Sequence, residues 1–166
     1  MTKKICFFDF DATLIKSPLP ETGKDIWKEK HGVDYPHLGW WGKEESLCLT
    51  AFDIKPNEEV LGKLLECDKN VLTVLLTNRI SRMETAVKAV IKHNDIKIDV
   101  HSFKYGRETK GQRIASFLDR YEDVKEVDFY DDIVEHFTDA MFLYEKYPTV
   151  DFNFFLVDEN GKIKEA

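Results

Sequence analysis

The first apolar run of the chain is Ile5-Cys6-Phe7-Phe8, and it leads directly into Asp9-Phe10-Asp11-Ala12-Thr13. A short apolar run that ends in acidic residues is typical of a buried strand, so we expect a strand over residues 5–10. Asp9 and Asp11 are two positions apart, and an extended backbone would point both carboxylates to the same side. The end of this strand is therefore a candidate site.

The rest of the chain alternates between strand-like and helix-like patterns. Apolar or alternating segments predict further strands over residues 71–76, 96–103, 127–130 and 151–157. Four helices are predicted between the strands. The first runs from Asn57 to about Cys67, the second from a capping box at Ser81–Glu84 towards His93, and the third starts at a second capping box, Thr109–Gln112. The last runs from Ile133 to about Tyr144, with Phe137, Met141 and Tyr144 on one stripe. This alternation predicts an α/β fold with a doubly wound, mainly parallel, five-stranded sheet.

Length and composition fit one domain over residues 1–166, with 43% apolar and 33% charged residues. Residues 14–50 interrupt the alternation, because they are rich in proline and glycine and contain the pair Trp40-Trp41. We expect an ordered flap after the first strand and no large cap domain. The tryptophan pair would pack this flap against the core or offer a platform for base stacking.

The net charge of −7 argues against a general nucleic-acid coat protein, but not against an enzyme that holds one phosphorylated end. The three cysteines are too few and too irregularly spaced for a disulfide framework or a zinc site. No segment has the apolar length needed to cross a bilayer. We expect a cytoplasmic protein without membrane contact, and the sequence indicates no stable protein partner.

Polar residues follow the predicted strands where each strand ends. Asp9 and Asp11 follow the first strand, Thr77-Asn78-Arg79 the second and Asp131-Asp132 the fourth. Ligands of parallel sheets bind beyond these carboxyl ends, and four carboxylates there require a cation, for which Mg²⁺ is the best fit. Lys110 opens the helix after the third strand, where the helix dipole disfavours a cation unless an anion such as phosphate lies nearby.

These motifs resemble those of the haloacid dehalogenase superfamily, in the same order along the chain. A closer similarity is to its Swiss-army-knife RNA-repair-like branch, on Phe8-Asp9-Phe10-Asp11, Ser17-Pro18-Leu19-Pro20, Gly39-Trp40-Trp41, Leu75-Leu76-Thr77-Asn78-Arg79 and Tyr130-Asp131-Asp132. The resemblance implies a Mg²⁺-dependent phosphohydrolase that forms an aspartyl phosphate. The superfamily usually has glycine where this chain has Ala12, and the branch tends to have arginine where it has Ile133.

Carried onto this chain, the resemblance implies a role for each matching residue. Asp9 would be the nucleophile and Asp11 the general acid and base, while Thr77 and Lys110 would bind the transferring phosphate. The expected metal ligands are Asp9, Asp11 through its backbone carbonyl, Asp131 and Asp132, with Asp131 in the first or second coordination shell. We expect substrate contacts from Thr13, Asn78, Arg79, Lys104 and Arg107. Lys104 is the rival of Lys110 because it directly ends the third strand, and His136 is assigned no catalytic role.

Several alternatives remain open on the sequence. Each motif alone has an ordinary structural explanation, such as a helix cap for Asp131-Asp132 or a solvated helix start for the cationic run Lys104, Arg107, Lys110 and Arg113. The leading hypothesis is a phosphatase that acts on an RNA or DNA end, with the cationic run gripping further phosphates. The alternatives are a nucleotidase or other small-molecule phosphatase, and a non-catalytic binding module that retains the fold.

Overall fold

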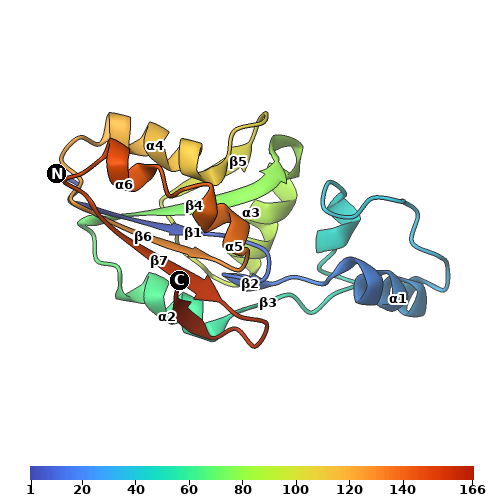
Figure 1. The fold of residues 1–166 in the computed structure, drawn as a ribbon. Helices are drawn as coiled ribbons and strands as arrows, with labels where there is room; N and C mark the ends of the chain where they lie inside the picture. Colours follow the sequence, from blue (N-terminus) through green and yellow to red (C-terminus); the bar gives the residue numbers. More distant parts are fainter.

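The computed structural model describes all residues from Met1 to Ala166. Its centre is a six-stranded sheet in the order β5-β4-β1-β6-β7-β8 (Figure 1). Five of the strands are parallel and β8 alone is antiparallel. The strands are β1 (Lys4–Phe8), β4 (Val71–Ile80), β5 (Val100–Lys104), β6 (Glu126–Asp131), β7 (Asp151–Val157) and β8 (Ile163–Glu165).

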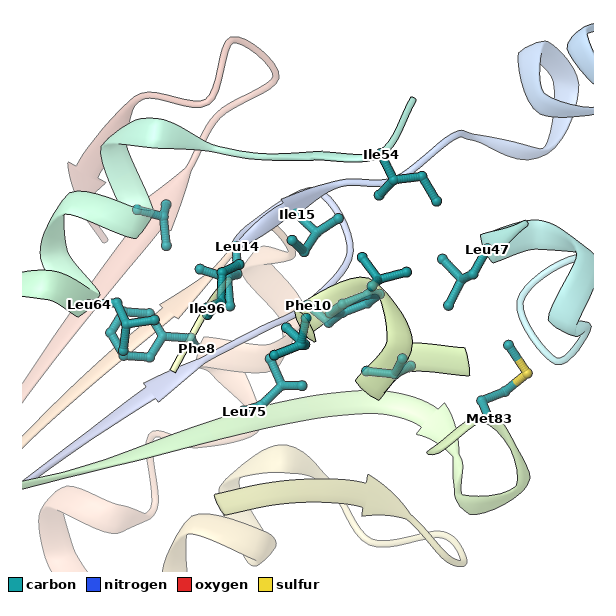
Figure 2. Packing of buried hydrophobic residues seen from close by; sticks show 14 of the residues in the cluster. Phe8, Phe10, Leu14, Ile15, Leu47, Ile54, Leu64, Leu75, Met83 and Ile96 are labelled. Atoms are coloured by element: carbon teal, nitrogen blue, oxygen red, sulfur yellow. The ribbon is translucent and has the colours of Figure 1, made fainter. Parts of the chain in front are cut away.

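Helices cover both faces of the sheet, which confirms the predicted doubly wound α/β fold. One face carries α2 (Glu58–Glu66) and α3 (Glu84–His93), and a large apolar cluster fills the space between them and the sheet (Figure 2). The other face carries α4 (Lys110–Arg120), α5 (Val134–Thr138) and α6 (Leu143–Lys146) over a second cluster. Because both faces are buried, the parallel strands are apolar almost throughout. No helix has the length and apolarity that a membrane span requires.

The chain leaves β1 and returns to the sheet through a narrow neck. Two short strands, β2 (Ile15–Lys16) and β3 (Lys55–Pro56), pair antiparallel and form this neck. Between them, residues 17–54 form an insertion that extends beyond the carboxyl ends of the strands, with α1 (Pro20–His31) and the 3₁₀ helix η1 (Glu44–Leu47) (Figure 1).

The insertion has its own aromatic packing around Trp40. The Trp40 ring is buried next to Tyr35 and Phe52, and it lies so close to Gly23 that a side chain at position 23 has no room. The indole Nε1 donates to the Pro18 carbonyl at 3.0 Å. Trp40 therefore packs the insertion, as one of the two sequence interpretations of the tryptophan pair expects.

Five boundary predictions need correction. The strand predicted over residues 96–103 starts later, because β5 spans only Val100–Lys104. The sheet has six strands and not five, since β8 was not predicted, and β4 continues to Ile80 instead of ending near residue 76. Ser81 opens a 3₁₀ turn, η2 (Ser81–Met83), without a side-chain cap, so the first capping box is wrong. The box at Thr109–Gln112 and the cap at Asn57 are confirmed.

The predicted helix from Ile133 to Tyr144 is also wrong, because it is divided into α5 and α6. The division lies where α4 approaches most closely: a Cβ atom on Gly111 would lie 2.7 Å from the Asp139 carbonyl oxygen. The division leaves Phe137 buried, while Met141 and Tyr144 are largely exposed and share no buried stripe with it.

Candidate active site

The carboxyl ends of β1, β4 and β6 bring the predicted polar residues to one edge of the sheet. In the parallel register Phe8 aligns with Leu75 on one side and Tyr130 on the other. Asp9 continues this pairing, because its N–H donates to the Tyr130 carbonyl at 3.0 Å. Asp9 and Asp131 therefore end adjacent strands and face each other across them.

Lys110 lies between these two carboxylates. Its Nζ atom donates to Asp9 Oδ1 at 2.7 Å and to Asp131 Oδ2 at 2.6 Å, and the lysine side chain is 1% exposed. Lys110 is the first residue of α4, whose start is fixed by the capping box of Thr109 and Gln112 and by the close approach at Gly111. Lys110, and not its rival Lys104, is thus the lysine next to Asp9.

Negative charge exceeds positive charge at this point. Oxygens of Asp9, Asp131 and Asp132 all lie within 4.8 Å of one another, with the single ammonium of Lys110 between two of them. Burial, together with the charge of Asp131, raises the pKa of Asp9 well above its usual value. Burial also raises the pKa of Asp132, again with Asp131 contributing. An additional cation would relieve this excess, and an all-oxygen donor set fits Mg²⁺.

Asp131 differs from the other two carboxylates because its hydrogen-bonding capacity is already used. Lys110 and His136 donate to Oδ2, and the backbone N–H of Ile133 donates to Oδ1 at 3.0 Å. Burial works against ionisation of Asp131, but the hydrogen bond from His136 and the charge of Lys110 outweigh it and lower the pKa. Asp131 is an ionised anchor for the lysine, and Asp9 and Asp132 have the freer oxygens.

Asp11 does not join this cluster, which corrects the expectation that four carboxylates converge. Its oxygens accept from Arg79 Nε at 2.9 Å and Nη2 at 2.8 Å, and from the Ser17 hydroxyl at 2.6 Å. Arg79 is almost fully buried, and its Nη1 also donates to the Trp41 carbonyl and the Ser46 hydroxyl, each at 2.9 Å. Arg79 thus joins β4, Asp11 and the insertion.

A pocket of about 350 Å³ lies above these residues. Its polar wall includes the predicted residues Asp9, Asp11, Thr77, Asn78, Arg79, Lys110 and Asp132. Its remaining wall consists of Ala12, Leu19, Trp41, Ile133 and His136. The pocket is large enough for a phosphate group and part of the group attached to it.

The structure does not place every predicted substrate contact in the pocket. Thr13 is buried, and its hydroxyl lies 3.3 Å from both Asp9 Oδ2 and Asp132 Oδ1, so it connects two carboxylates instead. Lys104 and Arg107 do not line the pocket. Arg113 is buried and donates to Thr77, Asn78 and Ser102, so the cationic run does not form one surface patch.

His136 is a site residue that the sequence interpretation missed. Asn78 Oδ1 accepts from Arg113, so the Asn78 amide group donates to His136 Nε2 at 3.2 Å, and His136 Nδ1 then donates to Asp131 at 2.9 Å. This chain of bonds orients Asp131 and, through it, Lys110. The available signal was the position of His136 shortly after the acidic pair, within the short helix α5.

Ala12 has a left-handed backbone, with a φ of 56°. An L-residue other than glycine, asparagine or aspartate is strained there. The turn at Ala12 lets the Leu14 N–H donate to the Asp9 carbonyl at 3.1 Å and thereby curls the chain around Asp9. The alanine is accommodated, but at a position that favours glycine.

Two solved structures resemble the fold of this chain over most of its length. A haloacid dehalogenase-like family hydrolase from Streptococcus pneumoniae matches with a TM-score of 0.53 and 15% identity, over 84% of this chain and 80% of that one. A protein from Lactobacillus plantarum that is proposed to be a phosphoglycolate phosphatase matches with a TM-score of 0.53 and 13% identity, over 93% and 86%. The chain has a haloacid dehalogenase-like fold. No protein-family model and no curated protein matches the sequence.

Proposed function

We propose that the protein is a Mg²⁺-dependent phosphomonoester hydrolase that acts through an aspartyl phosphate on Asp9. The observation that carries this proposal is the buried Lys110 held between Asp9 and Asp131 at the carboxyl edge of the sheet, at 2.7 and 2.6 Å. Burial of the Lys110 ammonium among an excess of carboxylates lowers the stability of the fold, unless the site also binds a metal cation and an anionic substrate. The hydrolases that share the fold support the same class of reaction.

In the first step a carboxylate oxygen of Asp9 attacks phosphorus, and the bond to the leaving oxygen breaks. Asp11, which accepts from Arg79 as a carboxylate, first has to take up a proton from solvent; it then gives this proton to the leaving oxygen and, as a carboxylate again, takes a proton from the water that hydrolyses the aspartyl phosphate. Lys110 and Thr77 face the same pocket and would neutralise and hydrogen-bond the transferring oxygens. Because Asp11 is paired with Arg79, its carboxylate has to turn towards the pocket to exchange this proton.

Asp9 and Asp132 would hold the magnesium ion, since Asp131 already accepts three hydrogen bonds. When bound, the ion offsets the repulsion between the anionic nucleophile and the phosphate. The Thr13 hydroxyl, 3.3 Å from both Asp9 and Asp132, keeps the two carboxylates next to each other.

The direct test is hydrolysis of an aryl phosphate by the purified chain with and without Mg²⁺. We expect release of phosphate that EDTA abolishes and that Asp9→Asn lowers by about a thousandfold or more, because the covalent route is lost. Asp99→Asn is the matched control, since Asp99 is bonded to Thr73 away from the pocket. Equal activity of the wild type and Asp9→Asn would favour the alternative of a non-catalytic binding module.

Two classes of natural substrate follow from the sequence: the phosphorylated end of RNA or DNA, and a mononucleotide or other small phosphomonoester. Lys104 and Arg107 end β5 or follow it, at the same carboxyl edge as the pocket but outside its wall. They could contact a substrate only if it extends beyond the pocket, which is the feature that favours a nucleic-acid end.

A comparison of a terminally phosphorylated oligonucleotide with the matching mononucleotide separates the two classes. A nucleic-acid end should give the higher kcat/KM, and Lys104→Ala with Arg107→Ala should weaken only the oligonucleotide, most strongly at low salt. Much faster hydrolysis of the mononucleotide would exclude the nucleic-acid end.

A further inference from the structure

The wall of the active-site pocket has an apolar part that the proposed chemistry does not use. Leu19, Trp41 and Ile133 line it and are 55%, 42% and 41% exposed. They come from three separate segments: the start of the insertion, the stretch of the insertion just before η1, and the loop after β6. Exposed apolar side chains that converge on one side of a charged pocket mark a place where a ligand removes apolar surface from water.

Trp41 is the member of this group whose position is fixed by the catalytic residues. Its carbonyl accepts from Arg79 at 2.9 Å, and the Arg79 guanidinium lies over its ring at 5.2 Å from the centroid. The same guanidinium holds Asp11 at 2.8 Å. One buried arginine therefore sets the position of the indole relative to the residue that protonates the leaving group. Trp40, by contrast, is buried in the insertion and has no surface to offer.

We propose that Trp41 determines specificity by stacking on a flat aromatic ring in the leaving alcohol of the substrate, as a nucleoside carries. The proposal rests on the proposed function, because the leaving oxygen must lie next to Asp11 and therefore on the side of Arg79 and Trp41. Leu19 and Ile133 complete the apolar wall for the same group. An indole that is half exposed and held by a cation offers a rigid face at little entropic cost, and stacking tolerates any base.

A second cavity, of about 690 Å³, shares Ala12, Leu19 and Asp132 with the active-site pocket. Its wall carries three acidic residues, Asp132, Asp158 and Glu159, and one lysine, Lys16, while Asp158 is also paired with Lys164 at 3.2 Å. A negatively charged strand is disfavoured there, whereas an uncharged ring next to Leu19 is not. The negative charge of this region therefore disfavours further phosphates on this side of the pocket. An uncharged aromatic group beside the reacting phosphate fits better.

The test compares nucleoside 5′- and 3′-monophosphates with ribose 5-phosphate, which lacks the base. We expect kcat/KM to be about tenfold higher for the better nucleotide than for ribose 5-phosphate, and Trp41→Ala to remove this preference by lowering kcat/KM about tenfold more for the nucleotide than for ribose 5-phosphate. Trp41→Phe should keep most of the preference because a ring remains. Leu38→Ala is the control, since Leu38 is a fully exposed apolar residue of the same insertion that does not line the pocket.

Calorimetric binding of the same ligands to Asp9→Asn protein with Mg²⁺ provides a readout that does not depend on turnover. Tighter binding of the nucleotide than of ribose 5-phosphate, lost in Asp9→Asn combined with Trp41→Ala, supports the stacking role even if no phosphate is released by the wild type. Equal affinities in calorimetry, or equal loss of both hydrolysis rates in Trp41→Ala, would overturn the stacking role and leave the phosphatase proposal standing.

Discussion

A lysine contacts carboxylates at both ends of the strand pair β1 and β6, and comparing the two groups separates a structural ion pair from a candidate site. At the amino ends, Lys4 Nζ lies 3.0 Å from Glu126 and 2.8 Å from Asp128. At the carboxyl ends, Lys110 lies between Asp9 and Asp131, with Asp132 close by. Both groups join the same pair of strands.

The amino-end group is paired with protein side chains and is partly exposed. Asn153 donates to Asp128 at 2.9 Å and to Glu126 at 3.3 Å, and the Lys4 side chain is 29% exposed. In the carboxyl-end group Lys110, Asp9 and Asp131 are buried and Asp132 is half-buried, and burial raises the pKa of Asp9 and of Asp132. A salt bridge alone does not identify a site. Unrelieved negative charge next to a pocket does, because a structural group has no reason to retain it.

Removal of each lysine should show this contrast with the largest effect. Lys110→Met leaves two buried carboxylates without their cation, so we expect the free energy of unfolding to fall by about 3 kcal/mol and activity by about a hundredfold or more. Lys4→Met affects a partly solvated group, and we expect a loss of about 1 kcal/mol with activity unchanged. Urea unfolding and aryl phosphate hydrolysis measure both. Similar losses of stability for the two variants would contradict the distinction.

Binding of Mg²⁺ should distinguish the two groups with a smaller effect. At a Mg²⁺ concentration tenfold above the Kd, the folded state gains about 1.4 kcal/mol, which raises the Tm by about 4 °C. Asp132→Asn should abolish the rise, while Asp128→Asn, at the amino ends, should keep it. Thermal scans with Mg²⁺ and with EDTA check this. If the rise in Tm persisted in Asp132→Asn and disappeared in Asp128→Asn, the Mg²⁺ site would lie at the amino ends of the strands, and the proposed site would be wrong.

Much of the fold and the heart of the site could be predicted from the sequence because they depend on local signals. Apolar runs mark the parallel strands, and the acidic residues Asp9 and Asp131-Asp132 stand where those runs end. Lys110 was placed correctly because a capping box identifies the first residue of a helix. Strand β8 was missed because Ile163–Glu165 is short and largely charged, and it pairs only through the turn that follows β7.

The remaining parts of the site depend on contacts between distant residues, which no local pattern encodes. The pairing of Arg79 with Asp11 requires β4 to continue to Ile80, beyond the apolar run that predicts it. The role of His136 depends on where α5 begins and on an amide of Asn78 that another arginine orients. The division between α5 and α6 lies where Gly111 of α4 packs closely against the chain, a contact that the sequence pattern does not show.

The smallest expected effect concerns the backbone. At each of the two ends of the strands, one residue other than glycine has a positive φ. Ala12, at 56°, follows β1 at the site, and Asp95, at 52°, follows α3 at the opposite edge. Aspartate tolerates this conformation because its side chain bonds locally, but alanine does not. We therefore expect Ala12→Gly to raise the free energy of unfolding by about 1 kcal/mol and Asp95→Gly to leave it nearly unchanged. Urea unfolding of both variants measures this.

If Ala12→Gly also lowers kcat/KM, the strained turn contributes to the position of Asp9, whereas unchanged activity means that the strain is only tolerated there.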